Sequence, residues 1–169
     1  MLESIYIENF AIIDRLEVDF HNHMTVLTGE TGAGKSIIID AIGQLMGNRS
    51  QSSFIKADCD ECFIEGVFTI GAKSPVLNKL KEYRIDYEDK LVVSKSFNRD
   101  NKSIIKINYR NVSKMVLQSI MADLIDIHSQ FETHSLFDAE NHLIILDEFI
   151  NQPLKKLFQT YSQIGRAHV

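Results

Sequence analysis

The chain has 169 residues, 44% hydrophobic and 24% charged, a balance typical of a globular domain with its own core. A net charge of −5 excludes a protein whose whole surface binds nucleic acid, so any DNA contact must be local or made elsewhere in the molecule. The sequence shows no signal peptide and no membrane span, and Cys59 and Cys62 form neither a disulfide framework nor a complete zinc site. It therefore predicts a cytoplasmic protein.

The first predicted elements are two strands and a helix. Residues 16–20 alternate apolar and charged side chains, as half-buried strands do, and the run 24–28 predicts a second strand that leads into a glycine-rich turn. From Lys35 onward, apolar residues at helical spacing predict a helix buried on a broad face. Gly47-Asn48 is its expected stop signal.

The middle of the chain predicts a strand, a short helix and a hairpin. The strand is expected over 61–70, and the helix after Ser74-Pro75, because proline is tolerated in a first turn. Two runs rich in β-branched residues, 90–98 and 103–109, flank a polar turn at 99–102 and predict the hairpin.

The last third reads as mainly helical. Ser113 is placed to cap a helix whose apolar positions include Met115. A short strand is expected over Leu124–Ile127. After Asp138, a candidate N-cap, the chain is expected to be helical to about Gln163.

One segment carries explicit chemistry, because residues 29–36 fit the pattern G-x-x-x-x-G-K-[ST]. Its glycines let the backbone turn so that N–H groups point at phosphate oxygens, and the following helix adds its positive end. Lys35 supplies a cation for the β- and γ-phosphates, and the Ser36 hydroxyl is the expected ligand of Mg²⁺. The predicted ATP-binding residues are Gly29, Glu30, Thr31, Gly32, Ala33, Gly34, Lys35 and Ser36.

The loop alone leaves several classes of nucleotide-binding protein open. A GTPase would need an Asn-Lys-x-Asp guanine reader, but Asn101-Lys102 is followed by Ser103-Ile104, which argues against GTP. Kinases, transporter ATPases and DNA-repair ATPases remain.

Longer stretches of sequence narrow the choice. The stretches concerned are 7–14, 27–42, 47–49, 94–109 and 126–130, within about residues 1–150. Together they closely resemble the start of the RecN family, in the SMC-like branch of ABC-type ATPases, which acts in recombinational repair of DNA double-strand breaks. The most specific are Asn9-Phe10-Ala11-Ile12-Ile13 and the Gly-Glu-Thr-Gly-Ala-Gly-Lys-Ser form of the loop.

The resemblance implies a fold and a division of the chain. The expected fold is α/β, the N-terminal half of a P-loop ABC-type, SMC-like ATPase head with a mixed sheet, leading into a coiled-coil helix. The head lobe is expected over 1–137 and the helical root of the arm over 138–163. Residues 164–169 lose the helical pattern and resemble a translated sequencing adapter, so they are expected to be a non-native tail.

The resemblance also implies further site residues. Gln130 matches the Q-loop glutamine, which reaches magnesium and the attacking water, so Lys35 and Gln130 are the expected catalytic residues. Arg49 lies where related heads carry an arginine that approaches nucleotide or DNA. Such heads hydrolyse ATP only when two of them enclose it, as in a homodimer, with signature and Walker B motifs from the C-terminal half. The complete protein is therefore expected to be a nucleoid-associated ATPase, and this chain alone to be inactive.

Two alternatives remain open: a transporter-type ATPase subunit and a small self-contained P-loop kinase. The kinase would use Asp147-Glu148, which follows four apolar residues in the manner of a Walker B strand. No signature motif precedes this pair, however, and the neighbouring apolar residues fit helical spacing. A helix is therefore the preferred interpretation of this segment.

A basic segment offers a local DNA surface. Between Lys95 and Lys114 lie six basic residues and one acid. On the second hairpin strand, one face is expected to carry Lys102, Lys106, Asn108 and Arg110, opposite Ile105, Ile107 and Tyr109. A DNA backbone fits such a face. The alternative is an ordinary solvated surface.

Overall fold

The computed structural model describes residues 1–29, 34–100, 102–125 and 127, and residues up to Asp126 form one compact unit. The second unit, Ile127–Val169, lies almost wholly outside the described residues. Several predictions therefore lie outside them too: Gln130, the Asp147-Glu148 pair, the helix from Asp138 and the tail over 164–169.

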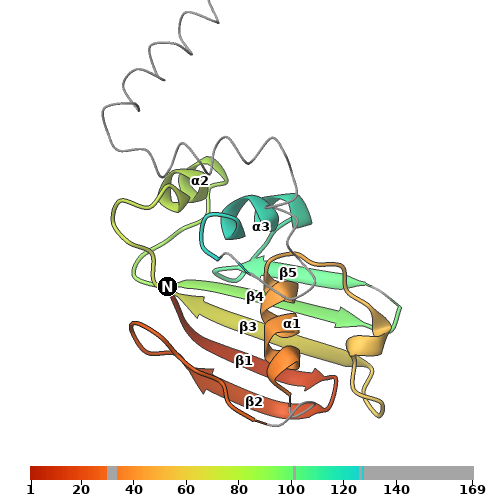
Figure 1. Ribbon diagram of the computed structural model, residues 1–169. Coiled ribbons are helices and arrows are strands. Elements are labelled where there is room, and N and C mark those ends of the chain that lie inside the picture. Colours follow the sequence, from red (N-terminus) through yellow and green to blue (C-terminus); the bar gives the residue numbers. More distant parts are fainter. Residues whose placement is uncertain (30–33, 101, 126, 128–169) are drawn as a thin grey trace, which may run out of the picture. The chain divides into compact units, whose positions relative to one another are not determined.

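The unit is built on a six-stranded sheet in the order β2-β1-β3-β4-β5-β6 (Figure 1). Every strand pair is antiparallel. The strands are β1 (Leu2–Phe10), β2 (Ile13–Asp19), β3 (Glu61–Phe68), β4 (Leu91–Asn98), β5 (Ser103–Ile107) and β6 (Arg110–Asn111). The predicted α/β class is confirmed, and so are the strands near 16–20 and 61–70 and the hairpin made by β4 and β5. The sheet was predicted to be mixed, but within the described residues it is antiparallel throughout.

Alternation along the strands divides the sheet into two faces. On one face the apolar side chains are buried to 1% exposure or less: Ile5, Ile7, Ile64, Phe68, Val93 and Phe97. On the edge strand β2, Leu16 and Val18 are half-buried while Glu17 and Asp19 are exposed, as the alternation predicts. The buried face is the floor of the hydrophobic core.

Helix α1 (Lys35–Leu45) lies across this buried face and contacts β1, β3 and β4 (Figure 1). Ala41 and Leu45 are fully buried, whereas Ile39 remains 43% exposed, so the buried stripe is narrower than the sequence predicts. Gly66 of β3 makes room for the helix, because a Cβ there would stand 2.8 Å from Leu45 Cδ1. A short 3₁₀ turn, η1 (Ser52–Phe54), follows the helix.

Two further helices, α2 (Val76–Glu82) and α3 (Lys114–Met121), pack together, and α3 also contacts β5. The predicted cap is confirmed, since the Val116 N–H donates to Ser113 Oγ at 3.4 Å. Lys79 links the pair through an ion pair with Asp123 at 2.7 Å. Met115, by contrast, is 80% exposed and does not belong to the core, because it lies on the outer side of the first turn.

The two other predicted strands were wrong. Residues 24–28 form no strand, and Met24 and Val26 are 83% and 65% exposed. A strand requires a neighbour for its backbone hydrogen bonds, and the sheet described here offers this segment none. In the predicted strand over 124–127, Leu124 and Ile125 instead donate to the carbonyl of Met121 and continue the end of α3, and Asp126 lies outside the described residues.

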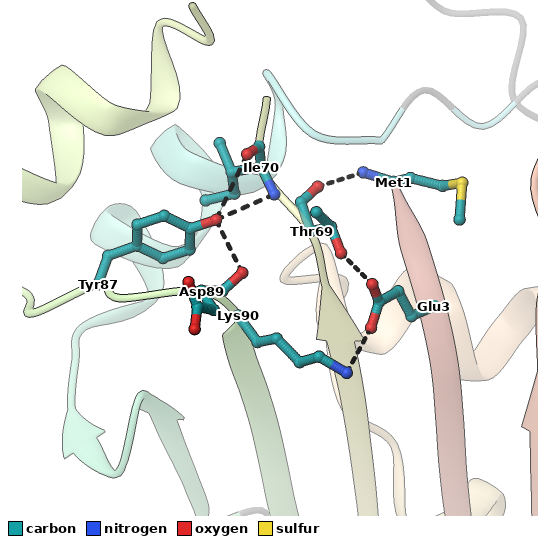
Figure 2. A network of polar contacts seen from close by, with 7 residues as sticks. All are labelled: Met1, Glu3, Thr69, Ile70, Tyr87, Asp89 and Lys90. Atoms are coloured by element: carbon teal, nitrogen blue, oxygen red, sulfur yellow. Dashed lines mark hydrogen bonds and ion pairs between the residues drawn. The ribbon is translucent and has the colours of Figure 1, made fainter. Parts of the chain in front are cut away.

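Polar contacts at one end of the sheet hold the chain start in register (Figure 2). The amino group of Met1 donates to the carbonyl of Thr69, whose hydroxyl donates to Glu3. Glu3 also pairs with Lys90 at 2.8 Å, and the hydrogen bonds from Lys90 and Thr69 lower the pKa of its carboxyl. These contacts tie β1 to the end of β3 and the start of β4.

The close approach at Gly66 predicts a measurable cost of adding one methyl group. Gly66→Ala forces Leu45 Cδ1 or the ring of Phe68 to move, so the free energy of unfolding should fall by about 1–3 kcal/mol in urea denaturation. Gly71→Ala is the matched control, because nothing lies within 4 Å of its Cβ position. Equal stability of the two variants would contradict this packing.

Candidate functional site

The start of α1 is shaped by glycine. Gly34 is the N-cap residue, with φ 91° and ψ −3°, the left-handed conformation that a side chain disfavours. Its carbonyl accepts from the N–H of Ile38 at 3.2 Å and so closes the first turn. The glycine of the loop pattern therefore stands where the backbone conformation needs it.

The first turn of α1 suits an anion. No side chain caps it and no acidic residue lies in it. The first N–H groups of a helix have no partner inside the helix, and the macrodipole makes this end positive. Lys35 is the first helical residue and Ser36, the second, is exposed. The structure thus brings Gly34, Lys35 and Ser36 together, whereas residues 30–33 lie outside the described ranges.

Triphosphate and magnesium fit this donor set. The backbone N–H groups match phosphate oxygens, and the Ser36 hydroxyl is an oxygen ligand of the kind Mg²⁺ prefers. Within the described ranges, no group of three His, Cys, Asp or Glu side chains forms a metal site of its own. A magnesium ion at Ser36 would therefore depend on nucleotide phosphates for most of its ligands.

The other end of α1 stops as predicted. Gly47 has φ 95°, and its N–H donates to the carbonyl of Gln44 at 3.1 Å, while the N–H of Asn48 donates to Gly43 at the same distance. These bonds satisfy carbonyl groups that the helix itself leaves open. The next residue is Arg49, whose side chain is exposed.

Arg49 is fixed at the end of α1 opposite the phosphate loop. Its carbonyl accepts from Gln44 Nε2 at 3.5 Å. Lys35 and Gln44 are nine positions apart in the helix, so at the usual rise per residue the distance between them along the helix axis is about 14 Å. An arginine side chain is much shorter than this. The Arg49 side chain therefore ends well short of the first turn of α1.

Sequence reasoning missed the importance of Lys95, which it placed in a basic surface. Lys95 is only 3% exposed, because it lies on the inward face of β4 between Val93 and Phe97. Its ammonium group donates to Gln44 Oε1 at 3.0 Å and to the Asn48 carbonyl at 2.8 Å. The alternation of β4 could have shown this from the sequence, because Val93 and Phe97, two residues before and after Lys95, are apolar and share its face of the strand.

The remaining basic residues of this segment are all exposed, but two of them hydrogen-bond to backbone carbonyl groups. Arg99 donates to the carbonyls of Lys56, Ala57 and Cys59, and Arg110 donates to that of Arg84. Lys102, Lys106 and Lys114 are exposed.

The predicted single basic face of this segment is wrong beyond β5. Asn108 and Tyr109 have positive φ and form a tight turn that ends the alternation. As a result Tyr109 is 83% exposed instead of lying with buried Ile105 and Ile107. Only Lys102 and Lys106 keep the predicted arrangement.

One of the two cysteines is too deeply buried to react readily. Both are free thiols, and burial raises the pKa of Cys62 to about 12. A thiol is reactive as its thiolate, so Cys62 is inert.

Among the described residues, no helix has the length and apolar character that crossing a membrane requires.

Burial of Lys95 predicts a pH-dependent stability. Burial, aided by repulsion from Lys114, lowers its pKa from 10.5 to about 8. Between these values the unfolded chain binds the extra proton, so stability rises with pH. Relative to Lys95→Met, the wild type should gain up to about 3 kcal/mol in free energy of unfolding from pH 8 to 10.5. Parallel pH profiles of the two proteins in urea denaturation would contradict the burial.

Comparison with known proteins agrees with this geometry. The family described as "AAA domain" matches residues 4–166. The DNA repair protein RecN of Bacillus subtilis is 40% identical over 170 residues, covering 100% of this chain and 30% of that protein. RecN of Halalkalibacterium halodurans is 39% identical with the same coverage. The chain thus spans about 30% of the length of these relatives.

A solved structure from work on "ATP-driven dimerization and DNA stimulated activation of SMC ATPases" has the same fold. Its TM-score is 0.62 at 18% identity, over 93% of this chain and 95% of that one. The AAA-type fold implies nucleotide binding. The chain therefore belongs to the AAA-domain family and, within it, is similar along its whole length to the RecN proteins.

Proposed function

We propose that the chain is the N-terminal, ATP-binding part of a RecN-type ATPase head that acts in the repair of DNA double-strand breaks. The observation that carries the proposal is the start of α1. A helix without a side-chain cap begins at left-handed Gly34, directly behind a glycine-rich loop, and packs on a sheet of the SMC type. Relatives named for DNA repair, 39–40% identical over the whole chain, support the cellular role.

Each site residue has a chemical role in this proposal. The backbone N–H groups from Gly29 to Gly34 hold the phosphates, Lys35 neutralises the β- and γ-phosphate oxygens, and the Ser36 hydroxyl ligates magnesium. Gln130 would orient the attacking water and serve as a further ligand of magnesium. Bound Mg·ATP supplies the phosphoryl group, and the protein supplies position and charge. Glu30, Thr31 and Ala33 complete the loop.

Hydrolysis requires surfaces that the described part of the chain does not contain. Residues 24–28 are exposed, include the apolar side chains of Met24, Val26 and Leu27, and immediately precede the loop. We infer that a strand from the rest of the protein pairs with it and completes the head. A second head then closes over the nucleotide, since ABC-type sites are shared between two heads. The chain alone binds nucleotide but does not turn it over.

DNA is the proposed partner of the exposed basic residues. Lys106 lies on β5, Lys102 immediately precedes this strand, and Lys114 begins α3. Exposed lysines bind the DNA backbone without reading its sequence. Through this contact the complete protein associates with the nucleoid.

The two rivals find less support. A transporter-type subunit or a small P-loop kinase would share the loop, but the long matches that cover the whole chain are to RecN proteins. A kinase would also need Asp147-Glu148 on a strand beside the loop, and this pair lies outside the described residues.

The phosphate-binding role predicts the effect of two substitutions in the complete protein. Lys35→Ala removes the cation at the phosphates, so the Kd for ATP should rise at least about tenfold, as fluorescent-nucleotide titration measures. Ser36→Ala should weaken only the magnesium-dependent part of binding and match the wild type in EDTA. Exposed Lys73→Ala is the matched control. Unchanged ATP affinity in Lys35→Ala would refute the proposed site.

Completion of the sheet predicts assembly in trans. When this chain and the remaining part of the protein are produced separately and mixed, they should associate and recover ATPase activity. Met24→Lys with Val26→Lys should prevent this, because charges cannot be buried in the new strand pair. Met115→Lys, at a residue equally exposed on α3, is the control. Association that survives the Met24 and Val26 substitutions would place the junction elsewhere.

A further inference from the structure

Lys95 is the most deeply buried charged side chain in the described part of the chain. Its Nζ lies 2.8 Å from the Asn48 carbonyl, 3.0 Å from Gln44 Oε1 and 3.3 Å from the Gln44 carbonyl. An ammonium group has three protons, so these acceptors can engage all of them. The acceptors belong to the last turn of α1 and the residues just after it, where the helix dipole is negative.

Gln44 extends this contact to the segment that carries Arg49. It is 2% exposed, and its Nε2 donates to the Arg49 carbonyl at 3.5 Å. Its Oε1 accepts from Ser50 Oγ at 3.3 Å as well as from Lys95. The side chain of Gln44 therefore links the buried ammonium group to Arg49 and Ser50, while Lys95 itself bonds to Asn48.

A third element presses on the same turn. Gln118 of α3 donates to the Gly47 carbonyl at 3.4 Å, and a Cβ on Gly47 would stand 2.6 Å from Gln118 Cγ. Residues 47–50 are thus held by α1, β4 and α3 together. The Arg49 guanidinium makes no hydrogen bond or ion pair within the described ranges, although its backbone is fixed.

A buried ammonium group is a costly way to fill space. Well-packed apolar residues of similar size often stabilise a protein as much as a buried charge does, or more. Lys95 has no carboxylate partner among the described residues and uses its protons on backbone and amide oxygens instead. Such a group fixes a particular backbone path, which an apolar side chain of equal volume does not do.

We propose that Lys95 is a positioning residue: through Gln44 and the Asn48 carbonyl it fixes the backbone of Arg49, so that the Arg49 guanidinium binds a DNA backbone phosphate at the end of α1 remote from the phosphate loop. Two observations favour DNA as the source of this phosphate. About 14 Å of helix separates the Gln44 end of α1 from its start. Lys114 also lies close enough to Lys95 to depress its pKa, so a second, exposed cation shares this region. The proposal rests on the proposed DNA-binding function.

The test measures DNA affinity of the complete protein against salt, with a short blunt-ended duplex and ATP present. Each phosphate contact contributes about 0.9 to the slope of log affinity against log salt concentration. Arg49→Ala and Lys95→Met should each lower the slope by about 0.9. The double variant should lower it no further, because both act on one contact. Lys81→Met, at an exposed lysine of α2, is the matched control and should keep the wild-type slope.

A purely structural role is separated by restoring the packing. Gln44→Leu with Lys95→Met replaces the polar pair by apolar side chains and should recover stability, yet the slope should stay lowered. If stability and slope recover together, Lys95 is only structural and the proposal is overturned. Gln44→Met, which keeps the bond from Lys95 to Asn48, should lower the slope in the same way and provides the test if the double variant does not fold.

Three further outcomes distinguish this inference from the proposed function. A wild-type slope in Arg49→Ala would overturn the DNA contact while leaving the ATP site intact. If the wild-type protein binds neither ATP nor the duplex, the proposed function itself fails. Weaker ATP affinity in Arg49→Ala without DNA would assign the guanidinium to nucleotide and overturn the inference.

Discussion

Helix α1 is held against the sheet at its C-terminal half, and the geometry of both its ends follows from that packing. Leu45 is fully buried above Gly66, where the absence of a side chain lets helix and strand approach closely. Burying a leucine contributes about 1.5–3 kcal/mol. Gly66 itself buries no side chain, but its lack of a Cβ lets Leu45 of the helix pack closely against the strand. This attachment leaves the N-terminal turn of α1 uncapped and exposed at Ser36, where the phosphate loop joins it.

Features that depend on neighbouring residues in the sequence were predictable. The alternation in β2, the Ser113 cap and the glycine stop at Gly47 each follow from local backbone chemistry. The loop pattern likewise predicted glycines that let the backbone turn before α1, and Gly34 is left-handed at that position. Features that depend on distant partners were not predictable. Residues 24–28 have a strand-like pattern, but the described sheet gives them no neighbour.

The contrast between local and distant interactions also applies to the candidate site. The loop residues could be predicted from their spacing alone, because the chemistry of phosphate binding requires those residue types in that order. Lys95 was misplaced because a lysine ordinarily indicates surface, and only the register of β4 shows that it faces the helix. Lys95, Arg99 and Arg110 donate to backbone carbonyls, so the exposed lysines of this segment without such a contact are Lys102, Lys106 and Lys114. With a net charge of −5, any DNA contact of this chain must be local.

Exposure of residues 24–28 gives the proposed assembly of the head a physical link to nucleotide binding. Backbone groups without partners are costly to bury, so a segment of this kind favours a strand partner. In the described structure Met24 is 83% exposed and Val26 is 65% exposed. Because this segment leads directly into Gly29, a strand that pairs with it would fix the base of the phosphate loop, while the sheet fixes α1 from the other side. The loop would then be anchored at both ends only in the completed head, so that nucleotide affinity would report on assembly.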